Sequence, residues 1–441
     1  MQEKNKKIAV ISLGCDKNRV DTENLLYILD DAGYEITASE DEFDIVIINT
    51  CAFIDSAKSE AIDNILDMAK IKEQRPIKII VSGCMGVRYA ESLMEQIPEV
   101  DAVIGFRDYQ EILSIIDRVE KGERFIYKEG KDLPFESRIV TTPYHYAYLK
   151  IAEGCDNKCT YCAIPSIRGK YVSRSIDSLV REANSLISGG ARELILVAQD
   201  VTRYGKDLYG EYSLKTLIEE LSKTDVEWIR LLYLYPELVT DDLLSLVKNN
   251  EKVCRYLDIP LQHVDSRILK LMNRRVDGDY VKRLIDKIRK VDENIAIRST
   301  FITGFPTETD EEHKRLVNFI KEYELDFAGF FAYSKEEGTA ASRIKEQIPE
   351  EVKAERLLEL ESAQMEVMLK KARNKVGKQM KVVYEGADYD LQEFVGRSEF
   401  NAPDIDTNVL LRSKNILEIG ETYNTTIVGT NGIDLIGEVN D

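Results

Sequence analysis

The segment AEGCDNKCTYCAIPSIRG, residues Ala152–Gly169, carries three cysteines, Cys155, Cys159 and Cys162, within eight residues of chain. It follows directly on YAYLKIA, an apolar run with the composition of a buried β-strand. Thiolates are good metal ligands, but structural zinc sites and most iron–sulfur clusters take four protein ligands. The segment therefore predicts a metal site in which the fourth ligand is something other than a cysteine.

Strands and helices alternate from this segment onward. The predicted strands are YAYLKIA, ELILVAQ, EWIRLLY, RYLDIPL, AIRSTFI and DFAGFFAY. Helical patterns separate them near Asp177–Ser188, Leu214–Ser222, Asp241–Lys248, Tyr280–Val291 and Glu311–Tyr323. Six such units with right-handed crossovers predict a partial (β/α)6 barrel over residues 144–376, which ends in a long amphipathic helix before Gly377. Such a barrel works at the carboxyl ends of its strands, where the cysteine segment lies.

The first 121 residues predict a separate parallel α/β sheet domain. KIAVISLG, FDIVIINT, IKIIVSGC and DAVIGF are short apolar strand patterns. Helical patterns accompany them near Asp21–Gly33, Ser56–Lys72, Ala90–Gln96 and Asp108–Glu120. Cys15, Cys51 and Cys84 each follow one of these strands, and ligands bind at that edge of an open α/β sheet. The three cysteines are expected to converge there; the alternative is three ordinary buried cysteines.

Two further segments complete the predicted organisation. Residues 122–143 are polar and are expected to form a linker with one short hairpin. Residues 377–441 contain five short strand patterns broken by Gly and Asn, which predict a small all-β barrel.

Composition and charge restrict the class of protein. The chain of 441 residues is 44 % hydrophobic and 32 % charged, as globular proteins are, and it has no apolar run long enough for a membrane helix. No signal peptide is recognisable, so we expect a cytoplasmic protein whose seven cysteines stay reduced. The net charge of −19 disfavours a general nucleic-acid binder and suits a basic protein partner.

The spacing C-x3-C-x2-C in EGCDNKCTYCAIP, placed after the first barrel strand, resembles the radical S-adenosylmethionine superfamily. The resemblance implies that Cys155, Cys159 and Cys162 hold a 4Fe–4S cluster whose fourth iron is left open for S-adenosylmethionine. Cleavage of that molecule yields a 5′-deoxyadenosyl radical. The resemblance further implies contacts to S-adenosylmethionine. The residues at the matching positions are Tyr161, Gln199, Asp200, Gly304 and Glu308.

The N-terminal cysteines narrow the family. SLGCDKNRVDTE, INTCAFIDSA and SGCMGVRY, together with the central segment and a terminal barrel similar to the TRAM module, resemble the methylthiotransferases over essentially the whole chain. In that family Cys15, Cys51 and Cys84 would hold a second 4Fe–4S cluster, and a sulfur species bound there would be methylated and transferred to a substrate carbon. S-adenosylmethionine would serve as methyl donor and as radical source, and a flavodoxin- or ferredoxin-like reductant and a sulfur donor would be required.

The substrate branch follows from residues near Cys15 and from charge. SLGCDKNRVDTE resembles the branch that modifies an aspartate β-carbon of ribosomal protein S12 more than the two tRNA branches. Residues 377–441 hold five basic and twelve acidic side chains, a net charge of 5 − 12 = −7. Phosphate binding requires Lys or Arg, so this tail should repel tRNA and attract a basic ribosomal protein. A tRNA methylthiotransferase is the alternative, and a non-enzymatic iron–sulfur or electron carrier is a more distant one.

The remaining candidates have plainer interpretations. Zinc would need a histidine beside the central cysteines, and the chain has only His145, His263 and His313, of which His145 is expected to pack or face solvent. Cys254 lacks partners in sequence and is expected to be structural. His263, in PLQHVDS, follows the fourth barrel strand, at the edge where catalytic residues of barrels lie, and the family that the chain resembles has the same Pro-Leu-Gln-His string; a catalytic role is the less favoured interpretation.

Overall fold

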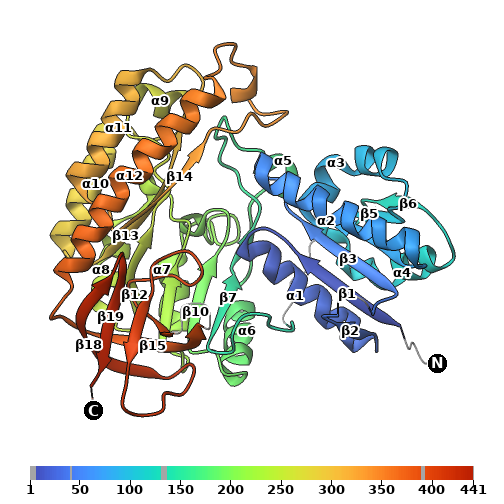
Figure 1. Cartoon of the computed structure of the whole chain (residues 1–441), viewed down its shortest axis with the longest axis horizontal. Coiled ribbons are helices and arrows are strands. Elements are labelled where there is room, and N and C mark those ends of the chain that lie inside the picture. Colours follow the sequence, from blue (N-terminus) through green and yellow to red (C-terminus); the bar gives the residue numbers. More distant parts are fainter. Residues whose placement is uncertain (1–5, 40–41, 131–136, 389–392, 441) are drawn as a thin grey trace. The chain divides into compact units, whose positions relative to one another are not determined.

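The computed structural model describes residues 6–39, 42–130, 137–388 and 393–440 (Figure 1). Residues 131–136 of the predicted linker and the first five residues lie outside this range. The described residues form two compact units. One comprises the described parts of 1–142 with 148–157 and 162–185, and the other comprises 143–147, 158–161 and the rest of the chain.

The first unit is built on a six-stranded sheet of order β2-β1-β3-β4-β5-β6, and every strand pair in it is parallel. The strands are β1 (Lys7–Ser12), β2 (Glu35–Thr37), β3 (Ile45–Thr50), β4 (Lys78–Ser82), β5 (Ala102–Ile104) and β6 (Phe125–Tyr127). The helices are α1 (Asp16–Asp31), α2 (Asp55–Gln74), α3 (Gly83–Gln96), η1 (Phe106–Glu111) and α4 (Ile112–Glu120). All six residues of β3 are buried, as expected of a strand covered on both faces.

The hairpin expected in residues 122–143 is not seen in its described part. Phe125–Tyr127 instead forms β6 and extends the N-terminal sheet, paired in parallel with β5. The ring of Phe125 lies 3.6 Å from the Arg118 guanidinium and packs on the core of the first unit. The packing of Phe125 on this core holds β6 in the sheet, although the residues around it are polar.

The second six-stranded sheet has the order β14-β13-β12-β11-β10-β7 and is open between β14 and β7. The strands are β7 (Tyr146–Lys150), β10 (Glu193–Val197), β11 (Trp228–Leu231), β12 (Val253–Asp258), β13 (Ala296–Thr303) and β14 (Phe327–Ala332). The helices that follow them are α6 (Ile176–Ser188), α7 (Leu214–Leu221), α8 (Asp241–Asn249), α9 (Ser266–Leu271), α10 (Gly278–Val291), α11 (Asp310–Tyr323) and α12 (Glu350–Asn374). The predicted partial barrel is confirmed, and α9 is the helix that the sequence pattern did not indicate.

The cysteine segment between β7 and β10 adds small elements of its own. β8 (Ala152–Glu153) pairs antiparallel with β9 (Val172–Ser173), and the short helix α5 (Ile164–Arg168) lies between them. Short 3-10 helices, η2 (Val201–Arg203), η3 (Pro236–Leu238) and η4 (Ala341–Arg343), occur in the loops of the second unit.

The tail forms the expected closed barrel, of strand order β15-β16-β17-β19-β18. Its strands are β15 (Gln379–Asp388), β16 (Glu393–Ser398), β17 (Val409–Arg412), β18 (Thr422–Asn431) and β19 (Asp434–Val439). Val382, Val409 and Ile427 form the centre of its core. Across the described residues of the whole chain, no helix combines the length and the hydropathy that a membrane crossing demands.

Candidate functional site

Cys15, Cys51 and Cys84 lie at the carboxyl ends of β1, β3 and β4, which are neighbouring strands of one sheet. Cys15 is the N-cap residue of α1, Cys51 follows β3 directly, and Cys84 is the second residue of α3. Both helices begin earlier than the sequence pattern predicted, so two of the three cysteines sit at helix starts.

The structure brings these three thiols together, as their electrostatic coupling shows. Burial, followed by the charge of Cys15, raises the pKa of the Cys51 thiol. Burial raises the pKa of Cys84 to about 12; Arg168 opposes this shift, and Cys15 and Cys51 add to it. Such thiols would ionise readily only beside a compensating positive charge, which a metal centre supplies.

The loops that carry Cys15 and Cys51 are fastened to each other. The Asn18 side-chain amide donates to the carbonyl oxygens of Leu13 and Thr50, each at 2.9 Å. Gly14 has φ = +90°, and a Cβ there would lie 2.7 Å from the Cβ of Cys51. Glycine is therefore required, because no side chain fits between the two loops.

Arg168, from α5, is the one cation in hydrogen-bond reach of these thiols among the contacts of the described residues. Its Nη2 lies 3.4 Å from the Cys84 Sγ and also donates to Asn18 Oδ1. Its Nη1 contacts Asp21 at 2.7 Å and Glu153 at 3.1 Å. Sequence reasoning missed Arg168, since the thiol that it contacts, that of Cys84, lies 84 positions away in the chain.

The donor set fits a cluster better than a single ion. Within the described parts of the chain, no three His, Cys, Asp or Glu side chains converge closely enough to ligate one metal ion. In a cuboidal cluster each thiolate binds a different iron, so the thiols need to surround a volume and not to meet at a point. That requirement is met here by three thiols that are buried or lie at the sheet edge, by a glycine that keeps the space between two loops open, and by one guanidinium.

The central cysteine segment folds back on itself. In the first unit, the Cys155 amide donates to the Gly169 carbonyl at 3.1 Å, and β8 and β9 close the segment. Gly154 has φ = +79°, and a Cβ there would lie 2.0 Å from the Lys170 carbonyl oxygen. Cys155 is buried and Cys162 is partly exposed.

Cys159 belongs to the second unit and lies at the carboxyl edge of its sheet. Its Sγ is 2.7 Å from the hydroxyl of Tyr235, which follows β11, and 3.9 Å from Arg274 Nη1. The Arg274 guanidinium stacks 4.0 Å from the Tyr235 ring centroid. Sequence reasoning missed both residues, since each comes from a loop more than 70 positions away.

Helix α9 holds the Cys159 loop in place. The Thr160 amide and hydroxyl donate to the Met272 and Leu271 carbonyls at 3.1 and 2.8 Å, and Asn273 donates to the Lys158 carbonyl at 2.7 Å. Tyr161 packs on the apolar cluster of Ile268, Met272, Phe305, Tyr333 and Ala341.

The other residues expected to contact S-adenosylmethionine lie beyond the ends of their strands, as predicted, but their roles remain predictions. Gln199 and Asp200 follow β10, and the Asp200 carboxylate caps η2 and accepts from Thr202 at 2.6 Å. Gly304 has φ = +68°, and its amide donates to Glu308. The fully buried Glu308 also lies 3.1 Å from Arg356 and 3.3 Å from His263.

The histidines and the seventh cysteine lie in packed surroundings. His145 is buried and its Nε2 lies 3.1 Å from Glu385. His263 is buried beside Glu308, and His313 Nε2 contacts Glu359 at 3.0 Å. Cys254 is buried in β12, where burial raises its pKa to about 12. These contacts agree with the structural interpretations of His145 and Cys254.

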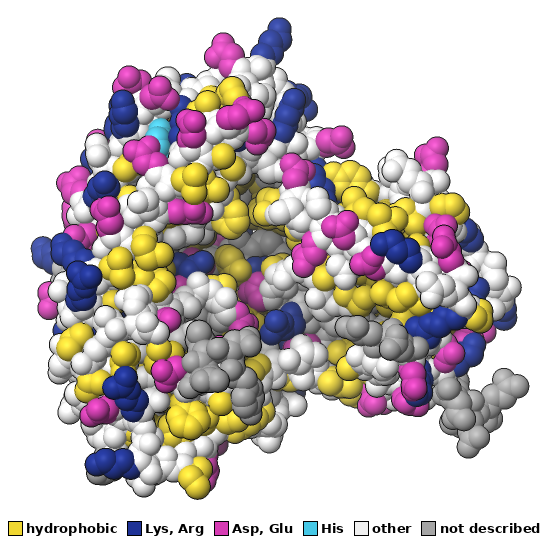
Figure 2. Space-filling model, viewed as in Figure 1, with side chains coloured by type: hydrophobic (Ala, Val, Ile, Leu, Met, Phe, Trp, Pro, Cys, Tyr) yellow, Lys and Arg dark blue, Asp and Glu magenta, His cyan; other side chains and the backbone are white. Residues whose placement is uncertain are grey.

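The tail barrel uses part of its acidic charge internally. Glu385, Glu399, Asp406 and Glu421 contact His145, Arg255, Arg298 and Arg192 of the central domain. The remaining acidic side chains of the tail, such as Glu418 and Glu438, include exposed ones. On the face shown in Figure 2, acidic and basic side chains are interspersed.

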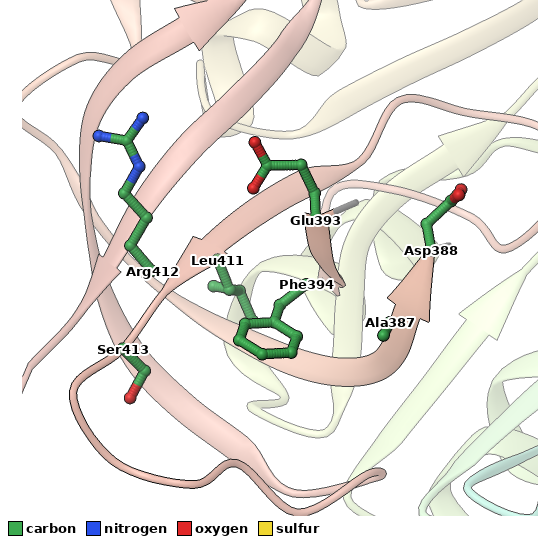
Figure 3. Close-up of a pocket in the computed structure, with 7 residues that line it drawn as sticks. All are labelled: Ala387, Asp388, Glu393, Phe394, Leu411, Arg412 and Ser413. Carbon is green, nitrogen blue, oxygen red and sulfur yellow. The ribbon is translucent and has the colours of Figure 1, made fainter. Parts of the chain in front are cut away.

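A hollow of about 490 Å³ lies on the tail barrel, away from all seven cysteines in sequence (Figure 3). Phe394, 47 % exposed, lies between its strand partners Ala387 and Leu411, and Asp388, Glu393, Arg412 and Ser413 complete the lining. None of its described lining residues is a cysteine or a histidine.

Three family models match the chain. They are Uncharacterized protein family UPF0004 over residues 7–105, the Radical SAM superfamily over 149–320 and the TRAM domain over 376–439. Among solved structures, the radical S-adenosylmethionine methyltransferase TsrM from Kitasatospora setae is similar, with a TM-score of 0.54 at 14 % identity over 74 % of this chain and 72 % of that chain. The fold and the family match thus define a radical S-adenosylmethionine enzyme.

Curated relatives specify the family. A ribosomal protein uS12 methylthiotransferase RimO from Thermoanaerobacter sp. (strain X514) is 44 % identical over 98 % of this chain and 100 % of its own length. Another from Clostridium novyi (strain NT) is 45 % identical over 99 % and 98 %. The chain belongs to the ribosomal protein uS12 methylthiotransferase family and is a radical transferase of methylthio groups.

Proposed function

We propose that this enzyme inserts a methylthio group at the β-carbon of an aspartate in ribosomal protein uS12, using two 4Fe–4S clusters and S-adenosylmethionine. The observation that carries the proposal is the convergence of Cys15, Cys51 and Cys84 at one sheet edge, in addition to the central C-x3-C-x2-C segment. One triplet would suffice for a radical enzyme, whereas a second is what sulfur transfer requires. The curated relatives, named for uS12, support the substrate.

The bound groups would supply an electron, a carbon radical and a sulfur atom, none of which a side chain can provide to an unactivated C–H bond. The chain's own residues would hold and orient them. Cys155, Cys159 and Cys162 would ligate one cluster and Cys15, Cys51 and Cys84 the other. Tyr235 and Arg274, both in contact with Cys159, would donate hydrogen bonds to its sulfur.

The finer assignments belong to the same proposal. Tyr161, Gln199, Asp200, Gly304 and Glu308 would line the S-adenosylmethionine site. Asp200 and Glu308 would do so by shaping the loops, since their carboxylates are engaged with the chain itself. Domain boundaries near residues 121, 143 and 376, a cytoplasmic location, a flavodoxin- or ferredoxin-like reductant and a separate sulfur donor complete the proposal.

Iron content and two cysteine variants test the two-cluster arrangement. Anaerobic reconstitution should give about eight irons per chain. Cys159→Ala should abolish formation of 5′-deoxyadenosine, whereas Cys51→Ala should keep that cleavage and lose methylthio transfer. About four irons in the wild type, or the loss of the same single activity in both variants, would contradict the arrangement.

Mass spectrometry tests the substrate. Ribosomal protein uS12 and tRNA are incubated separately with the reduced enzyme, S-adenosylmethionine and a sulfide source. An adduct with the mass of a methylthio group on an aspartate of uS12 is expected. The same adduct on tRNA alone would replace the proposed substrate with the tRNA alternative.

A further inference from the structure

Arg168 is a buried cation that no role described so far explains. Its side chain is 1 % exposed, and its guanidinium stacks 4.0 Å from the Phe106 ring centroid. Burying a guanidinium costs several kcal/mol unless its surroundings compensate it. Carboxylates compensate the charge of Arg168, but one of its guanidinium nitrogens also lies 3.4 Å from the thiol of Cys84.

The charges around Arg168 form a network within the first unit. Asp21 accepts from Arg168 at 2.7 Å and also pairs with Lys150, and Glu153 lies 3.1 Å from Arg168 and 3.0 Å from Lys150. Two cations and two carboxylates balance each other, so no further carboxylate is needed for neutrality. The contact with Cys84 is therefore additional to a network that is already neutral.

The path of the chain places Arg168, which contacts a thiol of the N-terminal triplet, shortly after the central triplet. Arg168 is the last residue of α5, and α5 starts two residues after Cys162 of the central triplet. Its backbone carbonyl accepts a hydrogen bond from Arg107 at 2.6 Å, and Gly169 follows with φ = +76°, where a Cβ would lie 2.9 Å from Arg107 Nη2. The backbone is thus held at the point from which the guanidinium reaches the other triplet.

We propose that Arg168 is a positioning residue of the N-terminal cluster site, where its permanent positive charge offsets the negative charge that accumulates on cluster and bound sulfur. This inference rests on the proposed function. An oxidised four-iron cluster with three thiolates carries about one net negative charge, and one-electron reduction or an anionic sulfur ligand adds to it. A guanidinium hydrogen-bonded to a ligand sulfur stabilises the more negative states and so raises the reduction potential.

The test measures the midpoint potential of the N-terminal cluster by redox titration with electron paramagnetic resonance detection. The full-length Cys155→Ala/Cys159→Ala/Cys162→Ala variant serves as background, so that one cluster gives the signal. Into it Arg168→Gln, Arg168→Lys and Asp21→Asn are introduced. Arg138→Gln is the matched control, because Arg138 is a buried arginine of the same unit, 3 % exposed and paired with Glu23 and Glu182.

Arg168→Gln is expected to lower the ratio of reduced to oxidised cluster at a given potential at least about tenfold, a shift of about 59 mV for one electron. Arg168→Lys should retain most of the potential. Asp21→Asn should shift the potential in the opposite direction, because it removes a negative charge from the network. Arg138→Gln should leave the potential unchanged.

The results separate this inference from the proposed function. A background protein that binds no iron overturns the two-cluster proposal, and the role of Arg168 with it. A background that binds about four irons, with an Arg168→Gln potential unchanged or equal to that of Arg138→Gln, overturns the role of Arg168 alone. If Arg168→Gln does not fold, Asp21→Asn decides, since an unshifted or lowered potential contradicts the proposal.

Discussion

Glu193→Gln is expected to destabilise the second unit by about 3–5 kcal/mol, the usual cost of breaking a buried ion pair. Glu193 starts β10, is 4 % exposed, and lies 2.6 Å from Arg230 and 2.7 Å from Arg397 of the tail barrel. Burial alone would raise the pKa of Glu193, but the charges of the two arginines outweigh burial and lower it. Glutamine keeps the shape of the side chain but removes the negative charge shared by the two guanidiniums, so that Arg230 loses its ion pair and Arg397 keeps only Glu385.

The assay is thermal unfolding of the cluster-free protein, followed by tryptophan fluorescence. Trp228, in β11, is the only tryptophan of the chain, so the signal reports on this unit. With about 2–4 °C per kcal/mol for a unit of this size, the midpoint should fall by at least about 6 °C. Adding Arg397→Gln to Glu193→Gln should recover part of the loss, because it removes the repulsion between Arg397 and Arg230 that Glu193 had offset.

The neighbouring residue provides the control. Arg192 pairs with Glu227 and Glu421, but its side chain is 35 % exposed, and exposed ion pairs contribute about 0–1 kcal/mol. Arg192→Gln should therefore shift the midpoint by less than about 4 °C. Equal shifts for Arg192→Gln and Glu193→Gln would refute the argument that burial makes the difference.

Three other outcomes are expected. Gly14→Ala should lower the iron content from about eight to about four per chain, because its Cβ would lie 2.7 Å from the Cβ of a ligand cysteine; unchanged iron would contradict the need for glycine. Burial alone would raise the pKa of the Glu312 carboxyl. Hydrogen bonds from Arg267 and from a backbone amide outweigh burial and lower this pKa to about 2, below its ordinary value of 4.5. The ionised Glu312 therefore contributes its full stabilisation above about pH 4.5 and loses it as the pH falls toward 2. Glu312→Gln should make the free energy of unfolding, measured with urea, less dependent on pH across that range and should lower it by about 1 kcal/mol at pH 7. An unaltered pH profile would contradict this. Glu418→Lys/Glu438→Lys should weaken binding of uS12 about tenfold at low salt and less at high salt, by calorimetric titration; equal affinity would exclude docking on this charge.

The fold was predictable because its signals are local. Buried parallel strands such as IVIINT, the whole of β3, are continuous apolar runs, and helices between them show the 3.6-residue period. The placement of Cys15, Cys51 and Cys84 at one edge was predictable for the same reason, since strand ends of a parallel sheet share one edge. The starts of α1 and α3 were less predictable from the sequence. Cys15 caps α1 without a side-chain hydrogen bond, and α3 begins with glycine, so neither start carries a capping signal.

The surroundings of the thiols were not predictable. Arg168, Tyr235 and Arg274 contact cysteines 84, 76 and 115 positions away, and nothing local distinguishes them from other arginines and tyrosines. The tail charge was predictable as a sum but not in its distribution. Among the described residues, five acidic side chains of the tail contact the central domain, those of Glu385, Glu399, Asp404, Asp406 and Glu421, which a count of charges cannot reveal.

The attachment of the tail barrel sets the distance between the tail and the cysteine edge of the central strands. Its contacts fall on the early residues of the central strands, with Arg397 on Glu193, the first residue of β10, and Asp406 on Arg298, the third residue of β13. Cys159 lies beyond the opposite ends of these strands, next to Tyr235. With a rise of about 3.3 Å per residue, β13 alone spans about 25 Å. A macromolecule anchored on the tail must reach roughly 20 Å to bring a carbon atom to the cysteine edge, the span of about six residues of extended polypeptide. A substrate protein docked on the tail would therefore need to present its target residue on a segment that projects about that far.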